Sequence, residues 1–164
     1  MLGKAAFLAG AVAGAVGLSQ FPEFSQQYLQ RLAGQVDALT LVVQDFDATA
    51  SRNNLSREDA LSQMQGSDFL ADRQQDLRRT FLRHARLSDN LVALRAAGPL
   101  ERLLMPQRLG DGETLQATWS DYRPAMPVTL EGLAAAGIGF FGGGALVSGL
   151  LALLAWPIRR RFAA

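Results

Sequence analysis

Two long stretches without a charged side chain, one near each end of the sequence, constrain the fold more than any other feature. Residues 5–18 and 133–156 contain no Asp, Glu, Lys or Arg. A helix needs about 20 mainly apolar residues to cross a hydrocarbon core about 30 Å thick. The second stretch meets this requirement, and the first meets its lower limit when it is extended to Phe21. We therefore predict a transmembrane helix at each end, over residues 1–21 and 128–157.

The first stretch has a second interpretation as a cleavable signal peptide. Such a peptide also combines a short positive start, an apolar run and small-x-small triplets, of which Ala11-Val12-Ala13 is one example. The residues alone leave both interpretations open, and we favour an uncleaved anchor.

The second apolar stretch carries signals for both ends of a helix. Thr129 suits the N-cap, Glu131 suits the positive end of the helix dipole, and Pro157 predicts the stop. Trp156 at one end, and Trp119 with Tyr122 before the other, are typical of aromatic anchors at a membrane surface.

The positive charges at the two ends of the sequence predict the orientation. Lys4 lies between the first apolar stretch and the N-terminus, and the run Arg159–Arg161 lies between the second stretch and the C-terminus. Cytoplasmic loops are enriched in such positively charged residues. Both ends, including a basic tail over residues 158–164, are therefore expected in the cytoplasm. Residues 22–127 are expected on the non-cytoplasmic side, which in a Gram-negative cell is the periplasm. This middle segment holds twelve arginines and fourteen acids, and its net negative charge disfavours nucleic acid as a partner.

The middle segment has the hydrophobic periodicity of helices. A first long helix is predicted over residues 24–52, because its apolar residues alternate in steps of three and four, as in a coiled-coil seam. These residues are Leu29, Leu32, Val36, Leu39, Val43, Phe46 and Ala50.

A second long helix is predicted over residues 67–97, with Ser67 as its cap and Gly98-Pro99 as its stop. Ser56 is predicted to cap a short helix over 57–65 that lies between the two. Because the long helices have similar lengths and one apolar stripe each, we expect an antiparallel hairpin. The predicted fold is thus an all-α membrane protein, with two transmembrane helices flanking a helical-hairpin domain.

Three motifs resemble a known bacterial family. They are GLSQFPEFSQQYLQRLAG at residues 17–34, LSREDAL at 55–61 and RPAMPVTLEG at 123–132. Together they resemble the membrane-protein family catalogued as the domain of unknown function DUF2937. The resemblance covers nearly the whole chain. It implies that the protein is located at a bacterial inner membrane, and it implies no activity, ligand or catalytic residue.

Small residues four apart are the most suggestive functional signal. Gly10 and Gly14 share one face of the first apolar stretch, and Ala135, Gly139 and Gly143 share one face of the second. Such spacing lets helix backbones approach closely in a membrane. We predict that these faces pack on each other, on a second copy of the chain or on a protein partner. The alternative is the general richness of bacterial membrane helices in Ala and Gly.

Arg79, Arg83 and Arg86 form a basic stripe on the second long helix. One interpretation is contact with an anionic headgroup or an acidic partner. The interpretation that we favour is ion pairing across the hairpin with acids of the first long helix, namely Asp37, Asp45 or Asp47.

Nothing in the sequence predicts a catalytic site, a cofactor or a metal site. There is no cysteine, and His84 is the only histidine, with helix neighbours that supply no ligand. We therefore expect a non-enzymatic scaffold or accessory subunit, anchored among membrane lipids and acting through helix association. The alternative is a component that binds or transports lipid or another anionic amphiphile.

Overall fold

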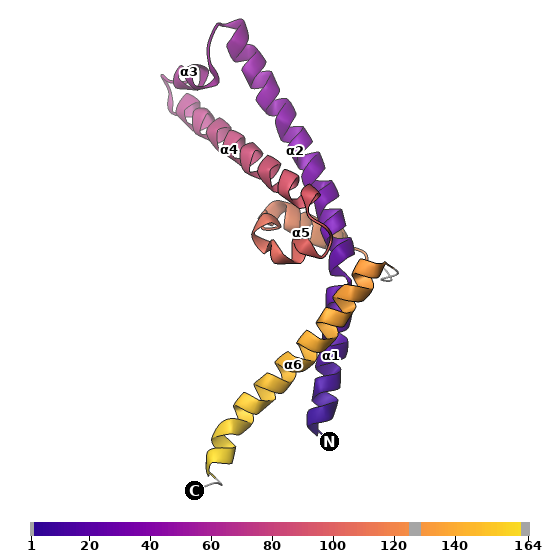
Figure 1. Ribbon diagram of the computed structural model, residues 1–164. Coiled ribbons are helices and arrows are strands. Elements are labelled where there is room, and N and C mark those ends of the chain that lie inside the picture. The colour runs from indigo at the N-terminus through magenta and orange to yellow at the C-terminus, as the bar shows by residue number, and fades with distance from the viewer. Residues whose placement is uncertain (1, 125–128, 162–164) are drawn as a thin grey trace. The chain divides into compact units, whose positions relative to one another are not determined.

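The computed structural model describes residues 2–124 and 129–161, and every regular element in these ranges is a helix (Figure 1). The elements are α1 (Leu2–Ser19), α2 (Phe21–Arg52), α3 (Arg57–Ser62), α4 (Asp68–Ala96), the 3-10 helices η1 (Glu101–Leu104) and η2 (Pro106–Arg108), α5 (Gly112–Asp121) and α6 (Leu130–Arg161). Within these ranges, the stretches Gly3–Arg52 and Leu130–Ala155 each contain a segment long and apolar enough to cross a membrane. The all-α prediction with two candidate spans is confirmed.

The chain forms two compact units. The membrane-helix unit comprises the residues up to Gln26, Pro99–Leu104 and the residues from Asp121 onward. The hairpin unit comprises Gln27–Gly98 and Met105–Ser120.

In the membrane-helix unit, α1 and α6 lie side by side and run antiparallel (Figure 1). α1 ends just before Gln20 because Pro22 has no N–H to donate to the carbonyl of Leu18. Helical bonding resumes at once, where the Phe24 amide donates to the Gln20 carbonyl at 3.0 Å.

Thr129 caps α6 as predicted, because its hydroxyl accepts a hydrogen bond from the Gly132 amide at 3.1 Å. The predicted stop at Pro157 is wrong, since α6 continues to Arg161. Proline removes one helical hydrogen bond, and a helix in a membrane tolerates this loss. The side chains of Trp156 and Arg159–Arg161 lie outside the described part of the structure.

In the hairpin unit, α2 and α4 form the predicted antiparallel hairpin, with α3 between them at the tip (Figure 1). The predicted seam of α2 is confirmed, since its residues are buried except for the half-buried Leu39 and Phe46. The facing stripe of α4 is buried at Leu77, Phe81, Leu87, Leu91 and Leu94.

The tip of the hairpin has its own small core. Val43, Leu61, Leu77 and Phe81 are buried together, and Phe46 packs on Phe81 with the two ring centroids 5.2 Å apart. α3 is thereby fixed across the open end of the two long helices.

The predicted caps at the tip are confirmed. The Ser56 hydroxyl accepts from the Asp59 amide at 3.1 Å, and the Ser67 hydroxyl accepts from the Leu70 amide at 3.3 Å. The helix after Ser56 ends at Ser62, three residues before the predicted end.

Candidate functional site

The glycines predicted as a packing face form a contact between α1 and α6 that we call the glycine clasp: Gly10, Gly14, Gly139 and Gly143. Gly14 lies against the backbone of Gly139, and Gly10 lies against that of Gly143. A methyl group added at Gly14 would overlap the Gly139 carbonyl oxygen, and one added at Gly139 would overlap the Gly14 carbonyl oxygen. The contact is therefore reciprocal, and it joins two helices of one chain.

Larger side chains flank the clasp. The Phe7 ring covers Gly144, where an added methyl group would overlap it, and it meets Phe140 edge-on with the ring centroids 6.4 Å apart. Ala135, the third small residue of the predicted α6 face, is fully buried. By contrast, Gly17 and Gly142 have open space where a side chain would be.

A second cluster lies in the hairpin unit around Asp111, whose side chain is only 5% exposed. Asp111 is the N-cap of α5, because its Oδ1 accepts a hydrogen bond from the Thr114 amide at 3.1 Å. The same carboxylate lies 3.1 Å from the Arg83 guanidinium and 3.4 Å from that of Arg86. Arg83 also contacts Glu113 at 2.6 Å. These charges dock the start of α5 onto α4.

The pKa of Asp111 shows the effect of this arrangement. Burial alone would raise it, but the hydrogen bonds from Thr114 and the adjacent Arg83 hold the pKa of Asp111 below its ordinary value. Nearby, burial raises the pKa of Tyr28, and the Asp111 backbone and the Arg86 charge offset this only in part. The Tyr28 side chain is fully buried, and among the described residues its hydroxyl has no hydrogen-bond partner of ordinary geometry.

The predicted partners of the arginine stripe are wrong. Arg83 and Arg86 pair with Asp111, and Arg79 pairs with Asp76 on its own helix. Asp47 of α2, one of the predicted partners, instead binds Arg57: the Arg57 Nε donates to the Asp47 Oδ1 at 2.7 Å. All three arginines of the stripe thus lie against acids of the same chain.

His84 joins the two long helices through a hydrogen bond. Its Nε2 lies 2.9 Å from the Thr40 hydroxyl of α2 and 3.4 Å from the Ser88 hydroxyl of α4. In the described part of the chain, no group of three or more His, Cys, Asp or Glu side chains is placed to hold a metal ion.

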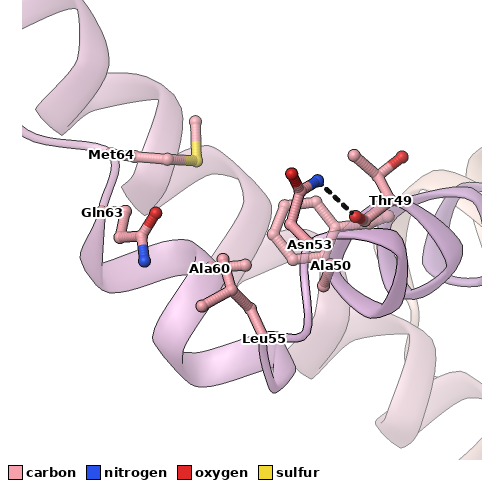
Figure 2. A pocket seen from close by; sticks show the side chains of 8 residues that line it. Thr49, Ala50, Asn53, Leu55, Ala60, Gln63 and Met64 are labelled. Carbon is pink, nitrogen blue, oxygen red and sulfur yellow. Dashed lines mark hydrogen bonds between the residues drawn. The ribbon is translucent and has the colours of Figure 1, made fainter.

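An open groove of about 460 Å³ lies at the hairpin tip (Figure 2). Its lining residues are apolar or uncharged: Phe46, Thr49, Ala50, Asn53, Leu55, Ala60, Gln63 and Met64. Figure 2 shows the Asn53 amide bonded to the Thr49 carbonyl, which accepts at 2.9 Å. The groove offers apolar contact and amide hydrogen bonds, but its lining provides no acid, base or nucleophile of ordinary catalytic type.

A family model for the protein of unknown function DUF2937 matches residues 2–160. The chain belongs to the DUF2937 family. Among curated proteins and solved structures, no significant match to the chain was found.

The two candidate spans of this DUF2937 chain differ from the core helices of a soluble protein. Only 11% of each apolar segment is buried within the protein. Side chains such as Val12 and Val16 of α1 and Phe141 and Leu146 of α6 are exposed. So much exposed apolar surface needs a cover that the described chain does not supply.

Asp111, Thr114 and Tyr28 were not predicted from the sequence. A signal for the first two was present, because Asp111-Gly-Glu-Thr114 has the spacing of an N-cap residue followed by the third helical residue that it binds. For Tyr28 there was none, since a tyrosine beside a heptad seam is ordinary. Its burial depends on α5, whose position cannot be derived from the periodicity of the chain.

Proposed function

We propose that this chain is a non-enzymatic, membrane-anchored scaffold or accessory subunit that presents the helical hairpin to a protein partner. The observation that carries the proposal is the glycine clasp. Its reciprocal contacts hold α1 and α6 together within one chain, so both ends of the hairpin domain are fixed to one anchor. Such an anchor suits a protein that holds a domain at a membrane surface.

The clasp also supports retention of α1. A cleaved signal peptide has no reason to match the small-residue face of a helix more than a hundred residues away. In α1, however, Gly10 and Gly14 face Gly143 and Gly139 in antiparallel order. We therefore propose that α1 is an uncleaved span.

The proposed location is the bacterial inner membrane, with both termini in the cytoplasm and residues 22–127 in the periplasm. Lys4 and Arg159–Arg161 support this orientation through the positive-inside rule. A reporter enzyme fused after Asn54 should be active only in the periplasm; cytoplasmic activity would reverse the proposed orientation.

Several charged groups of the hairpin unit have structural uses. Asp111 caps α5, Arg83 bridges Asp111 and Glu113, and Arg57 binds Asp47. The proposal of a non-enzymatic role is supported by these pairings, which give each of these named groups a role in holding the fold.

Binding of lipid or another anionic amphiphile is the alternative function. It has less support, because the arginines predicted to attract an anion already lie against Asp76, Asp111 and Glu113. The outward faces of α1 and α6 remain available to membrane lipids, a second copy or a partner subunit.

The scaffold proposal is tested by crosslinking in living cells. A photoreactive amino acid is placed at Leu41 of α2 or Leu82 of α4, both exposed on the hairpin. We expect one protein adduct of constant mass. Excess unlabelled chain should compete for it, and excess chain carrying Leu41→Glu or Leu82→Glu should compete less. A chain that yields no protein adduct, and that is monomeric in mild detergent, would contradict the proposal.

A further inference from the structure

α5 buries polar side chains and exposes apolar ones, which is the reverse of a helix on the surface of a soluble domain. Its inward side chains include Thr114 and Thr118, which are 1% and 2% exposed. Its outward side chains include Leu115 and Trp119, one turn apart, with Trp119 72% exposed. A helix whose other side faced water would bury its leucine and tryptophan.

The inward threonines are satisfied within the protein. The Thr118 hydroxyl donates to the Thr114 carbonyl at 2.7 Å, and the Thr114 hydroxyl donates to Asp111 at 2.9 Å. The polar face of α5 is thus packed and hydrogen-bonded within the protein, and its apolar face is exposed.

η1 shows the same inversion in the membrane-helix unit. Arg102 is 6% exposed and donates to the Gln26 side chain at 3.3 Å, whereas Leu104 is 82% exposed. Two short elements, one in each unit, therefore turn polar groups inward and apolar groups outward.

In the membrane-helix unit, η1 and Tyr122, the residue that follows α5, contact the chain just after the apolar run of α1 ends. Gln26, the partner of Arg102, lies six residues beyond Gln20. Tyr122 donates to the Gln20 side chain at 3.0 Å and meets Phe24 edge-on, with ring centroids 5.5 Å apart. Trp119 precedes Tyr122 by three residues, so the two Cα atoms are within about 11 Å of each other. This reach is comparable to the headgroup layer, roughly 5–8 Å thick on each side of the hydrocarbon core.

We propose that the apolar faces of α5 and η1 rest on the lipid surface of the membrane, with Leu104, Leu115 and Trp119 in the headgroup layer. Tryptophan is enriched at this depth because its ring is apolar and its N–H is polar. The nearby exposed charges include both signs, for example Glu101, Asp121 and Arg123. Binding therefore does not require anionic lipid. The inference rests on the proposed insertion of α1 and α6.

Depth-dependent fluorescence quenching tests the proposal, since the chain has two tryptophans. The full chain with Trp156→Phe retains only Trp119 and is reconstituted at about one copy per vesicle of phosphatidylcholine. Brominated phosphatidylcholine should quench Trp119, more strongly with bromines near the headgroup than with bromines deep in the acyl chains. When half of the unbrominated phosphatidylcholine is replaced with an anionic lipid, at the same fraction of brominated lipid, the quenching of Trp119 should be unchanged.

Two matched variants make the result decisive. Trp119→Phe retains Trp156 and reports whether α6 is inserted. Phe69→Trp, with both native tryptophans changed to Phe, places the probe at an exposed position near the hairpin tip and should be unquenched. Quenched Trp156 with unquenched Trp119 would overturn this inference and leave the proposed anchoring intact. If neither is quenched, the membrane anchoring itself fails. Equal quenching at positions 119 and 69 would also overturn the inference.

Discussion

α1 and α6 approach most closely at glycines, which have no side chain, whereas α2 and α4 meet through leucine, valine and phenylalanine. In the first pair, Gly14 and Gly139 bring the backbones into contact. In the second, Phe46 and Phe81 lie between the helices, and Thr40 binds His84 across them. The difference is the one expected if α1 and α6 lie in lipid, as we propose. Lipid gives little hydrophobic drive, so close backbone packing would hold the spans. Water drives burial of long apolar side chains.

The comparison implies that the two pairs fail under opposite mutations. Removing a side chain should break the hairpin, and adding one should break the clasp.

The largest effect is expected in the hairpin. Leu87 is fully buried, and Leu87→Ala should lower the free energy of unfolding by about 4 kcal/mol because it leaves a cavity. Unfolding of the full chain in detergent is followed by Trp119 fluorescence in a Trp156→Phe background. Leu82→Ala, at an exposed position on the same helix, is the control and should cost less than about 1 kcal/mol. Equal losses for the two variants would mean that the seam does not hold the hairpin.

Gly14→Ala is expected to cause a smaller loss of stability, in the association of α1 with α6. The added methyl group overlaps the Gly139 carbonyl, so the helices must separate, at a cost of about 3 kcal/mol. Separation of α1 and α6 in increasing sodium dodecyl sulfate, followed by energy transfer between dyes on the two helices, measures this loss. Gly17→Ala is the matched control, because nothing lies within 4 Å of the added carbon. Indistinguishable curves would remove the clasp from the account.

The Asp111 cluster should add a pH dependence to the hairpin alone. The folded-state pKa of Asp111 is depressed, so its contribution is fully present above the unfolded value near 4 and is lost as the pH falls through the lower folded value. Asp111→Ala removes the cap and should cost about 2 kcal/mol at neutral pH. Acid titration of the unfolding free energy checks this: the difference between wild type and variant should shrink below pH 4. A constant difference would contradict the assignment.

The smallest expected effect is a gain in the stability of the hairpin. Gly34 lies within α2, with nothing within 4 Å of an added methyl group, so Gly34→Ala should stabilise the hairpin by about 0.5–1 kcal/mol. The same substitution is thus expected to have opposite signs at Gly14 and Gly34. Denaturant unfolding measures it, and a destabilised Gly34→Ala variant would show that α2 has a neighbour on this face.

The sequence predicted what depends on short spacing. The seam from Leu29 to Ala50, the caps at Ser56, Ser67 and Thr129 and the two apolar spans follow from periodicity and local hydrogen bonding. They are found in the structure as predicted. Small-residue spacing indicated a packing face at Gly10 and Gly14, but spacing carries no information on whether its partner is in the same chain.

What the sequence did not predict depends on segments distant along the chain. Arg83 and Arg86 were assigned to acids of α2, because only the hairpin could be derived. In the structure their partner is Asp111, which reaches α4 through the turns after Pro99 and the position of α5. The burial of Tyr28 and Arg102 has the same origin. The positions of these groups depend on the irregular segments after Pro99, and such segments have no hydrophobic periodicity from which their path could be predicted.

Crosslinking between the spans tests the central claim, that the glycine faces join α1 and α6 of one chain. The chain has no cysteine, so Phe7→Cys with Phe140→Cys introduces a single pair beside the clasp. Leu8→Cys with Phe141→Cys, both exposed, is the control. A protease site inserted between Gln65 and Gly66 divides the chain into two pieces. After oxidation in membranes, the first pair should keep the two pieces of one chain together, and the control pair should not. Dimers of doubled mass from the first pair, or no crosslink at all, would contradict the account.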